Sequence, residues 1–190
     1  MNKAEKLCVG VLPLARSTFD VPFAKQVCSD AWNLMNSMPV NWVGSSELLF
    51  DAEAVEKQIL NLKEKNIDLL FIMQLTFTDA TLTVKLAQSF DVPILFWSFP
   101  EARTGGRLRL NSLCGVNLAA HALGKTGIQC DYINLSPIDP ETKEKLTSWM
   151  RTFQAYKNLS NTKIAVIGDH PDGFDTCSYD SKKLREISGA

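Results

Sequence analysis

Polar and aromatic side chains that could bind a small molecule follow two apolar segments of the chain. Arg16 and Phe19 follow residues 7–12, and Phe77 follows residues 68–73. A planar guanidinium offers several donors to a sugar hydroxyl or a carboxylate, and aromatic rings can form an apolar wall beside it. We interpret Arg16, Phe19 and Phe77 as candidate binding residues. The alternatives are a surface salt bridge for Arg16 and packing against a neighbouring helix for the two rings.

A third loop contains a glycine-rich turn that could hold a phosphate. Arg103, Gly105 and Gly106 lie in the segment that follows residues 93–97. No Gly-x-Gly-x-x-Gly or Gly-x-x-x-x-Gly-Lys-Ser/Thr pattern follows any apolar segment, so dinucleotide and triphosphate binding lose their main support. A flexible glycine turn is the alternative interpretation.

Acidic side chains gather near the end of the chain. Asp169, His170, Asp172 and Asp175 lie within one short segment, and carboxylate oxygens could hold a hard metal ion there. Pro-Asp and Asp-Gly pairs also form turns, which is the interpretation that we prefer. No serine nucleophile elbow or His-Glu-x-x-His pair is present, and we expect His121 to be a buried helix residue. We therefore predict no catalytic residue and no metal ligand in this chain.

The elements that would position these residues alternate between strand-like and helix-like patterns. Short runs of branched apolar residues predict strands, and apolar residues at helical spacing predict helices between them. The expected strands are residues 7–12, 40–43, 68–73, 93–97 and 130–134. Such alternation implies parallel pairing with helices on both faces. We predict a doubly wound, five-stranded α/β domain over residues 1–137, flavodoxin-like, with strand order 2-1-3-4-5.

A second unit is expected to begin after this domain. Asp139 and Pro140 form a helix start, and the helix that follows, residues 138–160, is interpreted as a connector. Residues 163–167 predict a buried strand that opens a second α/β domain over residues 161–190. One strand and one short helix bury too little apolar surface to be stable alone, so we expect this second domain to be incomplete.

Composition excludes several classes of function. Hydrophobic residues make up 45% of the chain, charged residues 22%, and the net charge is −1. Basic residues are dispersed among acids, so no nucleic-acid footprint is present. No apolar run has bilayer length and no secretory signal is found, so we expect no membrane association and a cytoplasmic location.

Three blocks in order resemble the N-terminal region of the L-fucose and L-arabinose isomerase family. The blocks are Gln74-Leu-Thr-Phe77, Leu110-Asn-Ser-Leu-Cys-Gly115 continuing to His121, and Thr147-Ser-Trp-Met-Arg151 leading to residues 167–169. The resemblance spans nearly the whole chain. It implies two flavodoxin-like domains followed by a C-terminal domain that carries the chemistry of an aldose–ketose isomerase.

The resemblance also implies that catalysis and substrate binding are carried by different domains of the full-length enzyme. Mn²⁺ and the acid–base groups would lie in polypeptide beyond this chain, which alone would be inactive. The first domain would line the sugar pocket of a neighbouring subunit in a homo-oligomer, a trimer or hexamer. Carried over to this sequence, the substrate-binding candidates are Arg16, Phe19, Phe77, Pro171 and Asp172.

Two departures from the family pattern leave the identity of the sugar open. Leu75 stands where arabinose-type relatives tend to have a histidine, and the loop after the first strand lacks their glutamine. Two other functions remain as alternatives. The chain could be a non-catalytic sugar-binding or sugar-sensing α/β module, or a flavodoxin-like flavin protein.

Overall fold

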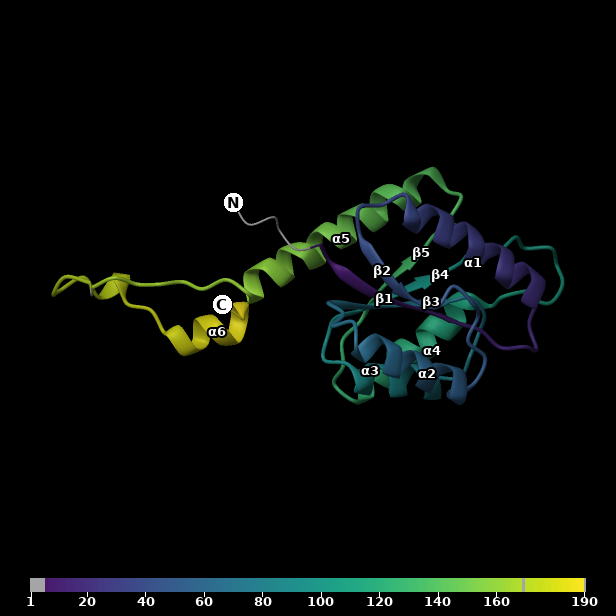
Figure 1. Cartoon of the computed structure of the whole chain (residues 1–190), viewed down its shortest axis with the longest axis horizontal. Coiled ribbons are helices and arrows are strands. Elements are labelled where there is room, and N and C mark those ends of the chain that lie inside the picture. Colours follow the sequence, from purple (N-terminus) through teal and green to yellow (C-terminus); the bar gives the residue numbers. More distant parts are fainter. Residues whose placement is uncertain (1–5, 169, 190) are drawn as a thin grey trace.

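Five parallel strands form a single sheet in the computed structural model, which describes residues 6–168 and 170–189. The strand order is β2-β1-β3-β4-β5, which confirms the predicted α/β fold and its order (Figure 1). The strands are β1 (Cys8–Leu14), β2 (Asn41–Gly44), β3 (Leu69–Gln74), β4 (Ile94–Ser98) and β5 (Asp131–Asn134). All residues of β1, β3 and β4 are buried, as expected for the central strands of a parallel sheet covered on both faces.

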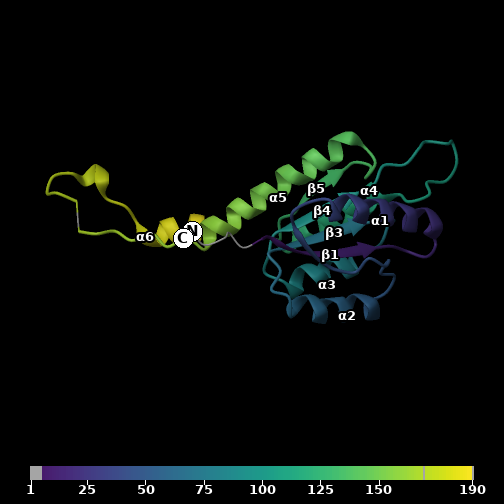
Figure 2. The ribbon, with the colours of Figure 1, turned by 45° about the horizontal axis from the view of Figure 1, so that its top comes forward.

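Helices cover both faces of this sheet. One face carries α1 (Val21–Asn36) and α5 (Pro140–Ser160), and the other carries α2 (Ala52–Lys63), α3 (Thr81–Ser89) and α4 (Ser112–Lys125). Figures 1 and 2 show the two layers from different sides. Successive side chains of a strand point to opposite faces, so Phe71 joins the core under α1 and α5 while Ile72 joins the other core.

Side chains at the helix starts explain where the chain turns out of the sheet. The carboxylates of Asp20, Asp51 and Asp139 accept hydrogen bonds from backbone N–H groups in the first turns of α1, α2 and α5. Pro140 occupies the first helical position of α5, where a missing N–H costs nothing. Before α3, Asp79 accepts a hydrogen bond from the Thr81 N–H. These caps fix where the loops at the carboxyl ends of β1 and β3 end.

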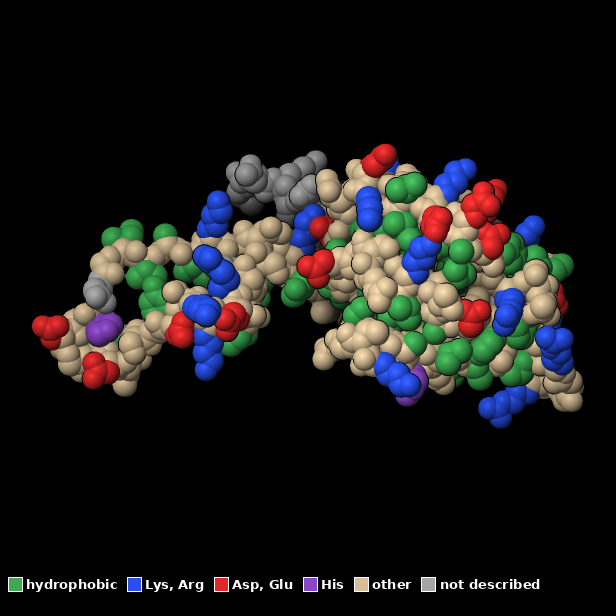
Figure 3. Space-filling view, turned by 90° about the horizontal axis from the view of Figure 1, so that it is seen from below, with side chains coloured by type: hydrophobic (Ala, Val, Ile, Leu, Met, Phe, Trp, Pro, Cys, Tyr) green, Lys and Arg blue, Asp and Glu red, His purple; other side chains and the backbone are tan. Residues whose placement is uncertain are grey.

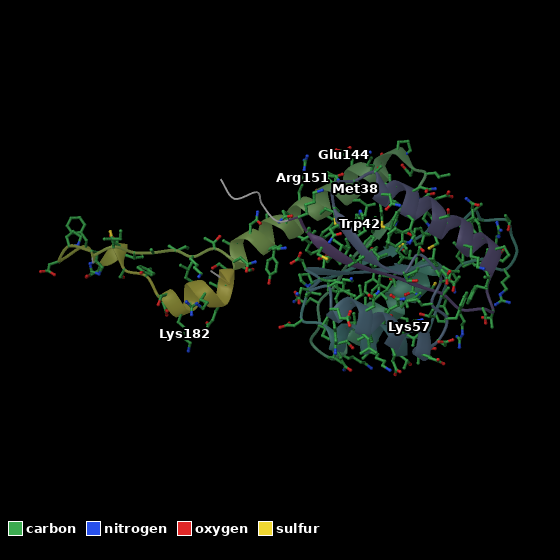
Figure 4. The ribbon with its side chains drawn as sticks, viewed as in Figure 1. Met38, Trp42, Lys57, Glu144, Arg151 and Lys182 are labelled. Atoms are coloured by element: carbon green, nitrogen blue, oxygen red, sulfur yellow. The ribbon has the colours of Figure 1, made fainter. Side chains whose placement is uncertain are left out.

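The helix α5 belongs to the sheet domain over most of its length. Leu146, Met150 and Phe153 are buried in the core that it shares with α1 and β1. Met38 and Trp42, labelled in Figure 4, lie on the same side of the sheet. Near its end, Lys157 forms an ion pair of 2.9 Å with Asp68, and both side chains are mostly buried. The predicted connector is therefore packed against the first domain.

The remaining segment has no such core, because none of its described residues, 161–168 and 170–189, belongs to either hydrophobic cluster. The predicted buried strand at residues 163–167 is wrong for this structure, because the segment pairs with none of the described strands and Ile167 is 99% exposed. A strand in the middle of a sheet needs neighbours for its backbone groups, and β1 to β5 offer none here. Among the described residues of this segment, only the short helices η1 (Asp175–Cys177) and α6 (Ser181–Ser188) form. Whether the segment opens a second domain stays a prediction.

This segment, which we call the tail, projects from the end of α5 (Figure 1). The helix α6 lies beside that end, where a Cβ added at Gly189 would be 3.0 Å from Ser160. Figure 3 shows hydrophobic side chains exposed along the tail. They are Ile164, Val166, Ile167, Phe174, Tyr179, Leu184 and Ile187.

Candidate functional site

Three loops meet at the carboxyl end of the sheet and form one surface. These are residues 15–20 after β1, residues 75–80 after β3 and residues 99–111 after β4, and together we call them the rim. The Arg16 N–H donates to Thr76 Oγ1 at 2.7 Å, which joins the first loop to the second. The Phe77 N–H donates to the Leu110 carbonyl at 2.8 Å, which joins the second to the third. The rim lies where the strand order reverses between β1 and β3, the usual binding position in such sheets.

An aromatic pair occupies the centre of the rim. The rings of Phe19 and Phe77 lie 6.2 Å apart between centroids and are tilted by 48°. Both side chains are half-buried, so each ring keeps part of its surface open to a ligand. The guanidinium of Arg107 lies 5.3 Å from the centre of the Phe19 ring. The structure therefore brings together two of the predicted residues and adds an arginine that the sequence analysis missed.

Arg16 borders the same pair and is half-exposed. Its Nη2 lies 3.9 Å from Asp79 Oδ2, the outer limit of an ion pair, so the contact is worth little in water. Hydrogen bonds from Thr81, followed by the charge of Arg16, hold the pKa of Asp79 below its usual value. The expected surface salt bridge is present in this loose form. Most of the guanidinium donors of Arg16 remain available for a ligand.

Arg109, in contrast, is fixed within the rim. Its Nε donates to Asp20 Oδ2 at 2.8 Å, and its guanidinium lies 3.8 Å from the centre of the Phe23 ring. The pKa of Asp20 is lowered by the hydrogen bond from the Phe23 N–H and then by Arg109. The Asp20 N–H also donates to the Arg109 carbonyl at 3.1 Å. Arg109 therefore ties the third loop to the first.

Glu101 anchors the third loop from within. Its carboxylate accepts hydrogen bonds from the backbone N–H groups of Arg109, Leu110 and Asn111, at 2.5, 3.1 and 2.7 Å. Asn111 adopts a left-handed conformation, with φ of 52°, at the start of α4. Sequence reasoning missed Glu101 and Arg107. The available signal was the run of arginines at positions 103, 107 and 109, directly before a helix.

A buried polar group supports the second loop from below. The side-chain amide of Gln74 donates to the Thr76 carbonyl at 2.7 Å and to Thr78 Oγ1 at 2.9 Å. The Ser112 hydroxyl donates to the Gln74 carbonyl and accepts from the Phe99 N–H. Gly115 packs so closely that an added Cβ would be 3.0 Å from the Gln74 side chain. Two of the sequence blocks, residues 74–77 and 110–115, thus pack against each other beneath the rim.

Other predicted residues lie elsewhere. Pro171 and Asp172 are exposed in the tail, at the opposite end of the molecule from the rim, so this chain does not bring them near Phe77 (Figure 1). Asp169 lies outside the described residues. His121 was expected to be buried, and that expectation is wrong. It is exposed because it lies on the outer face of α4, whereas Val116, Ala119 and Leu123 face the sheet.

The described residues offer no assembled metal centre. Within residues 6–168 and 170–189, no group of three or more His, Cys, Asp or Glu side chains is placed to hold an ion. In the same part of the chain, no helix has both the length and the apolar character needed to cross a bilayer. The guanidinium groups and aromatic rings of the rim can bind and orient a ligand.

Comparison with known proteins gives a consistent match. Residues 10–160 match the family described as fucose/sulfoquinovose isomerase, N-terminal domain. A sulfoquinovose isomerase from Alkalicoccus urumqiensis is 28% identical over 184 residues, which cover 97% of this chain and 41% of that protein. One from Priestia aryabhattai is 26% identical over 178 residues, which cover 94% of this chain and 40% of that protein. The chain thus spans about 40% of the length of these relatives.

Solved structures add only a distant likeness. A lac repressor dimer bound to operator and the anti-inducer ONPF is 14% identical, covers 78% of this chain and 61% of its own, and has a TM-score of 0.38. A similarity at this level carries no argument about function.

Proposed function

Because this chain belongs to the fucose/sulfoquinovose isomerase family, whose N-terminal domain it matches over residues 10–160, we propose that it is the substrate-binding part of a metal-dependent aldose–ketose isomerase. The observation that supports this proposal is the rim. Arg16, Phe19 and Phe77 lie together at the ligand-binding edge of a doubly wound sheet. Aromatic rings pack against the C–H groups of a sugar, and guanidinium donors bind its hydroxyl groups.

The rim forms one wall of the proposed pocket. Arg16 and Arg107 are exposed and the two phenylalanines are half-buried, so the rim is an open surface. We propose that a neighbouring subunit of a homo-oligomer, a trimer or hexamer, supplies the opposite wall. Pro171 and Asp172 remain proposed substrate contacts. Their distance from the rim within one chain means that they would have to act at another subunit's pocket.

The chemical step is proposed to take place on residues outside this chain. Mn²⁺ bound by the full-length enzyme would polarise the two sugar oxygens between which the carbonyl moves. The described residues do not assemble a ligand set for this ion, so they do not fit a manganese site. The rim residues of this chain would hold the sugar and orient it, in a cytoplasmic enzyme.

Parallel assays test this assignment. The 190-residue chain and a polypeptide extended to the length of the relatives are assayed for Mn²⁺-dependent aldose–ketose conversion. We expect activity only in the longer protein. In the longer protein, Phe77→Ala should raise KM roughly tenfold with little change in kcat, because the ring binds ground state and transition state alike. Phe50→Ala, at an exposed ring in the loop before α2, is the control.

Three outcomes would contradict the proposal. Conversion by the 190-residue chain would show that the chemistry lies within it. Sugar binding without conversion in the longer protein would favour the sensing module. Uptake of a yellow flavin would favour the flavin protein.

A further inference from the structure

We propose that the outer face of α5 binds the same face of a second copy of this chain, with the two helices antiparallel about a two-fold axis. The inference goes beyond the proposed function and does not depend on sugar binding. Of the two oligomers proposed above, a hexamer made of two trimers contains two-fold contacts, whereas a trimer alone does not.

The surface in question is a groove that runs along α5. The apolar side of this helix is buried against the sheet. The groove lies on the exposed side, extends from Pro140 to Ala155 and has a volume of about 800 Å³. All the residues that line it belong to α5, and we call it the α5 groove. At 1.5 Å per residue it is about 22 Å long, which is enough for a second helix to lie along it.

Small side chains form the floor of the α5 groove. They are Thr147, Ser148, Thr152 and Ala155. Small side chains at a contact let two helix axes approach closely. The Thr147 hydroxyl donates to the Lys143 carbonyl at 2.7 Å. The Thr152 hydroxyl donates to the Ser148 carbonyl at 3.1 Å. Both hydroxyls therefore keep a hydrogen bond when a second helix displaces water from the groove.

Two charges of opposite sign flank the middle of the α5 groove. Glu144 and Arg151 are exposed and lie on the outer side of α5 (Figure 4). Neither side chain forms an ion pair with another described residue. They are two turns apart in the helix, farther than the three- and four-residue spacings at which side chains of one helix meet. Both charges are therefore open to a partner.

The lining of the α5 groove is symmetric about its midpoint, between positions 147 and 148. When two antiparallel helices cross there, residues at equal distances on either side face each other. Glu144 of each copy then faces Arg151 of the other, which gives two pairs of opposite charge. The other facing pairs contain no like charges; they are Lys143 with Thr152, Pro140 with Ala155, and Thr147 with Ser148.

The same charges disfavour the parallel arrangement. Two parallel helices in register would place Glu144 beside Glu144 and Arg151 beside Arg151. Like charges that face each other across an interface repel, and this repulsion suppresses the wrong arrangement. The charge pattern of the α5 groove therefore selects an antiparallel copy of itself.

An adjoining hollow extends the surface toward β2. It has a volume of about 200 Å³ and shares Thr147 and Arg151 with the α5 groove. Pro39, Val40 and Met150 also line it, so its burial would add apolar area to the charge pairs. A contact along about four helical turns is still smaller than a standard interface of roughly 1,600 Å². We therefore expect a weak dimer, with a Kd of roughly 10–100 µM.

Charge reversal tests the inference, with sedimentation velocity over a range of protein concentrations as the measurement. Glu144→Arg makes both charges of the groove positive, and Arg151→Glu makes both negative. Each variant alone should dimerise at least tenfold more weakly, because both facing pairs become repulsive. An equal mixture of the two variants should form a heterodimer as tight as the original dimer, because each facing pair then joins opposite charges.

Two further variants separate this effect from a change in folding. The double variant Glu144→Arg/Arg151→Glu should dimerise like the original chain, because the facing pairs are restored with their signs exchanged. Lys145→Glu is the control, since Lys145 is exposed on α5 but does not line the groove. It should leave the Kd unchanged. Added salt should weaken the dimer, because the charge pairs lie at an exposed surface.

The contrary results are equally specific. A chain that stays monomeric up to several hundred micromolar would overturn the inference. Association that neither single reversal weakens would also overturn it and would point to the exposed apolar residues of the tail. Single reversals that weaken the dimer, without recovery in the mixture or in the double variant, would rule out the antiparallel pairing. None of these results would affect the sugar-binding assignment of the rim.

Discussion

Similar apolar residues are buried in the sheet domain, residues 6–160, and exposed in the tail, residues 161–189. Ile72 in β3 has no exposed surface, whereas Ile167 in the tail is 99% exposed. Both lie in short runs of branched residues of the kind that favours strands. The difference is that Ile72 has strands on both sides and helices on both faces, and Ile167 has neither. An apolar, branched sequence allows a segment to form a strand. Whether the strand forms depends on adjacent strands and covering helices.

The same contrast separates the candidate site residues. Arg16, Phe19 and Phe77 lie on loops fixed by a complete core and by hydrogen bonds between the loops. Pro171 and Asp172 lie in the segment without a core. A binding residue must be held in position before its ligand arrives, which favours the rim as the working surface of this chain.

The largest expected difference between the sheet domain and the tail is in the free energy of unfolding when a large aromatic side chain is removed from each. Trp97 is fully buried, lies 4.9 Å from Phe99 between ring centroids, and donates from Nε1 to the Leu135 carbonyl. Trp97→Ala should lower the free energy of unfolding by about 3–5 kcal/mol. Phe174→Ala in the tail, where the ring is mostly exposed, should change it by less than about 0.5 kcal/mol. Urea unfolding measures both values. Similar losses of unfolding free energy in the two variants would contradict the difference in packing between the sheet domain and the tail.

Two glycines of α4 provide a sharper test within the sheet domain. Gly115→Ala should destabilise the fold by about 1–3 kcal/mol. The new Cβ would press on Gln74, which cannot move without losing its bonds to Thr76 and Thr78. Gly124→Ala should stabilise the fold by about 0.5–1 kcal/mol, because nothing lies within 4 Å and alanine favours the helix. Chemical denaturation gives both signs. Equal signs would contradict the packing described beneath the rim.

Acid titration tests the pairing of Asp20 with Arg109. The folded pKa of Asp20 lies below the usual 3.8, so its stabilising effect is complete above that value and is lost as the pH falls through the folded pKa. Asp20→Asn keeps the helix cap but should flatten this loss of stability below about pH 4. Asp180→Asn in the tail should leave the acid profile of the domain unchanged. An unchanged profile in Asp20→Asn would argue against the pair.

The smallest effect concerns thiol reactivity, which leaves the fold intact. Burial raises the pKa of Cys28 to about 11, whereas Cys177 in the tail is exposed. Iodoacetamide should therefore label Cys177 rapidly and Cys28 only on unfolding, since the thiolate is the reactive form. Mass spectrometry after timed labelling measures the order. Early labelling of Cys28 would indicate that the core under α1 opens easily.

Much of the sheet domain could be predicted from the sequence because its signals are local. Alternating apolar patterns located all five strands, and Asp139 with Pro140 located the start of α5. The strand predicted at residues 163–167 failed because its formation depends on distant neighbours, which a local pattern does not show. His121 was misplaced for a related reason. Because α4 is apolar over much of its surface, its sequence does not show which face packs against the sheet.

The candidate site was only partly predictable. Arg16, Phe19 and Phe77 follow strands, so the rule that ligands bind beyond strand ends located them. Glu101 and Arg107 could not be found in this way. Their roles depend on how residues 99–111 fold back onto the first loop, and the contacts of Arg107 with Thr18 and Phe19 join positions far apart in sequence.

Amide spectra recorded while the chain is titrated with sulfoquinovose test the central claim most directly. The account predicts shifts in proton–nitrogen correlation peaks at residues 15–20, 75–80 and 99–111, with the tail unchanged. Shifts concentrated at residues 170–180, with the rim silent, would contradict the claim that the sheet domain carries the sugar-binding surface.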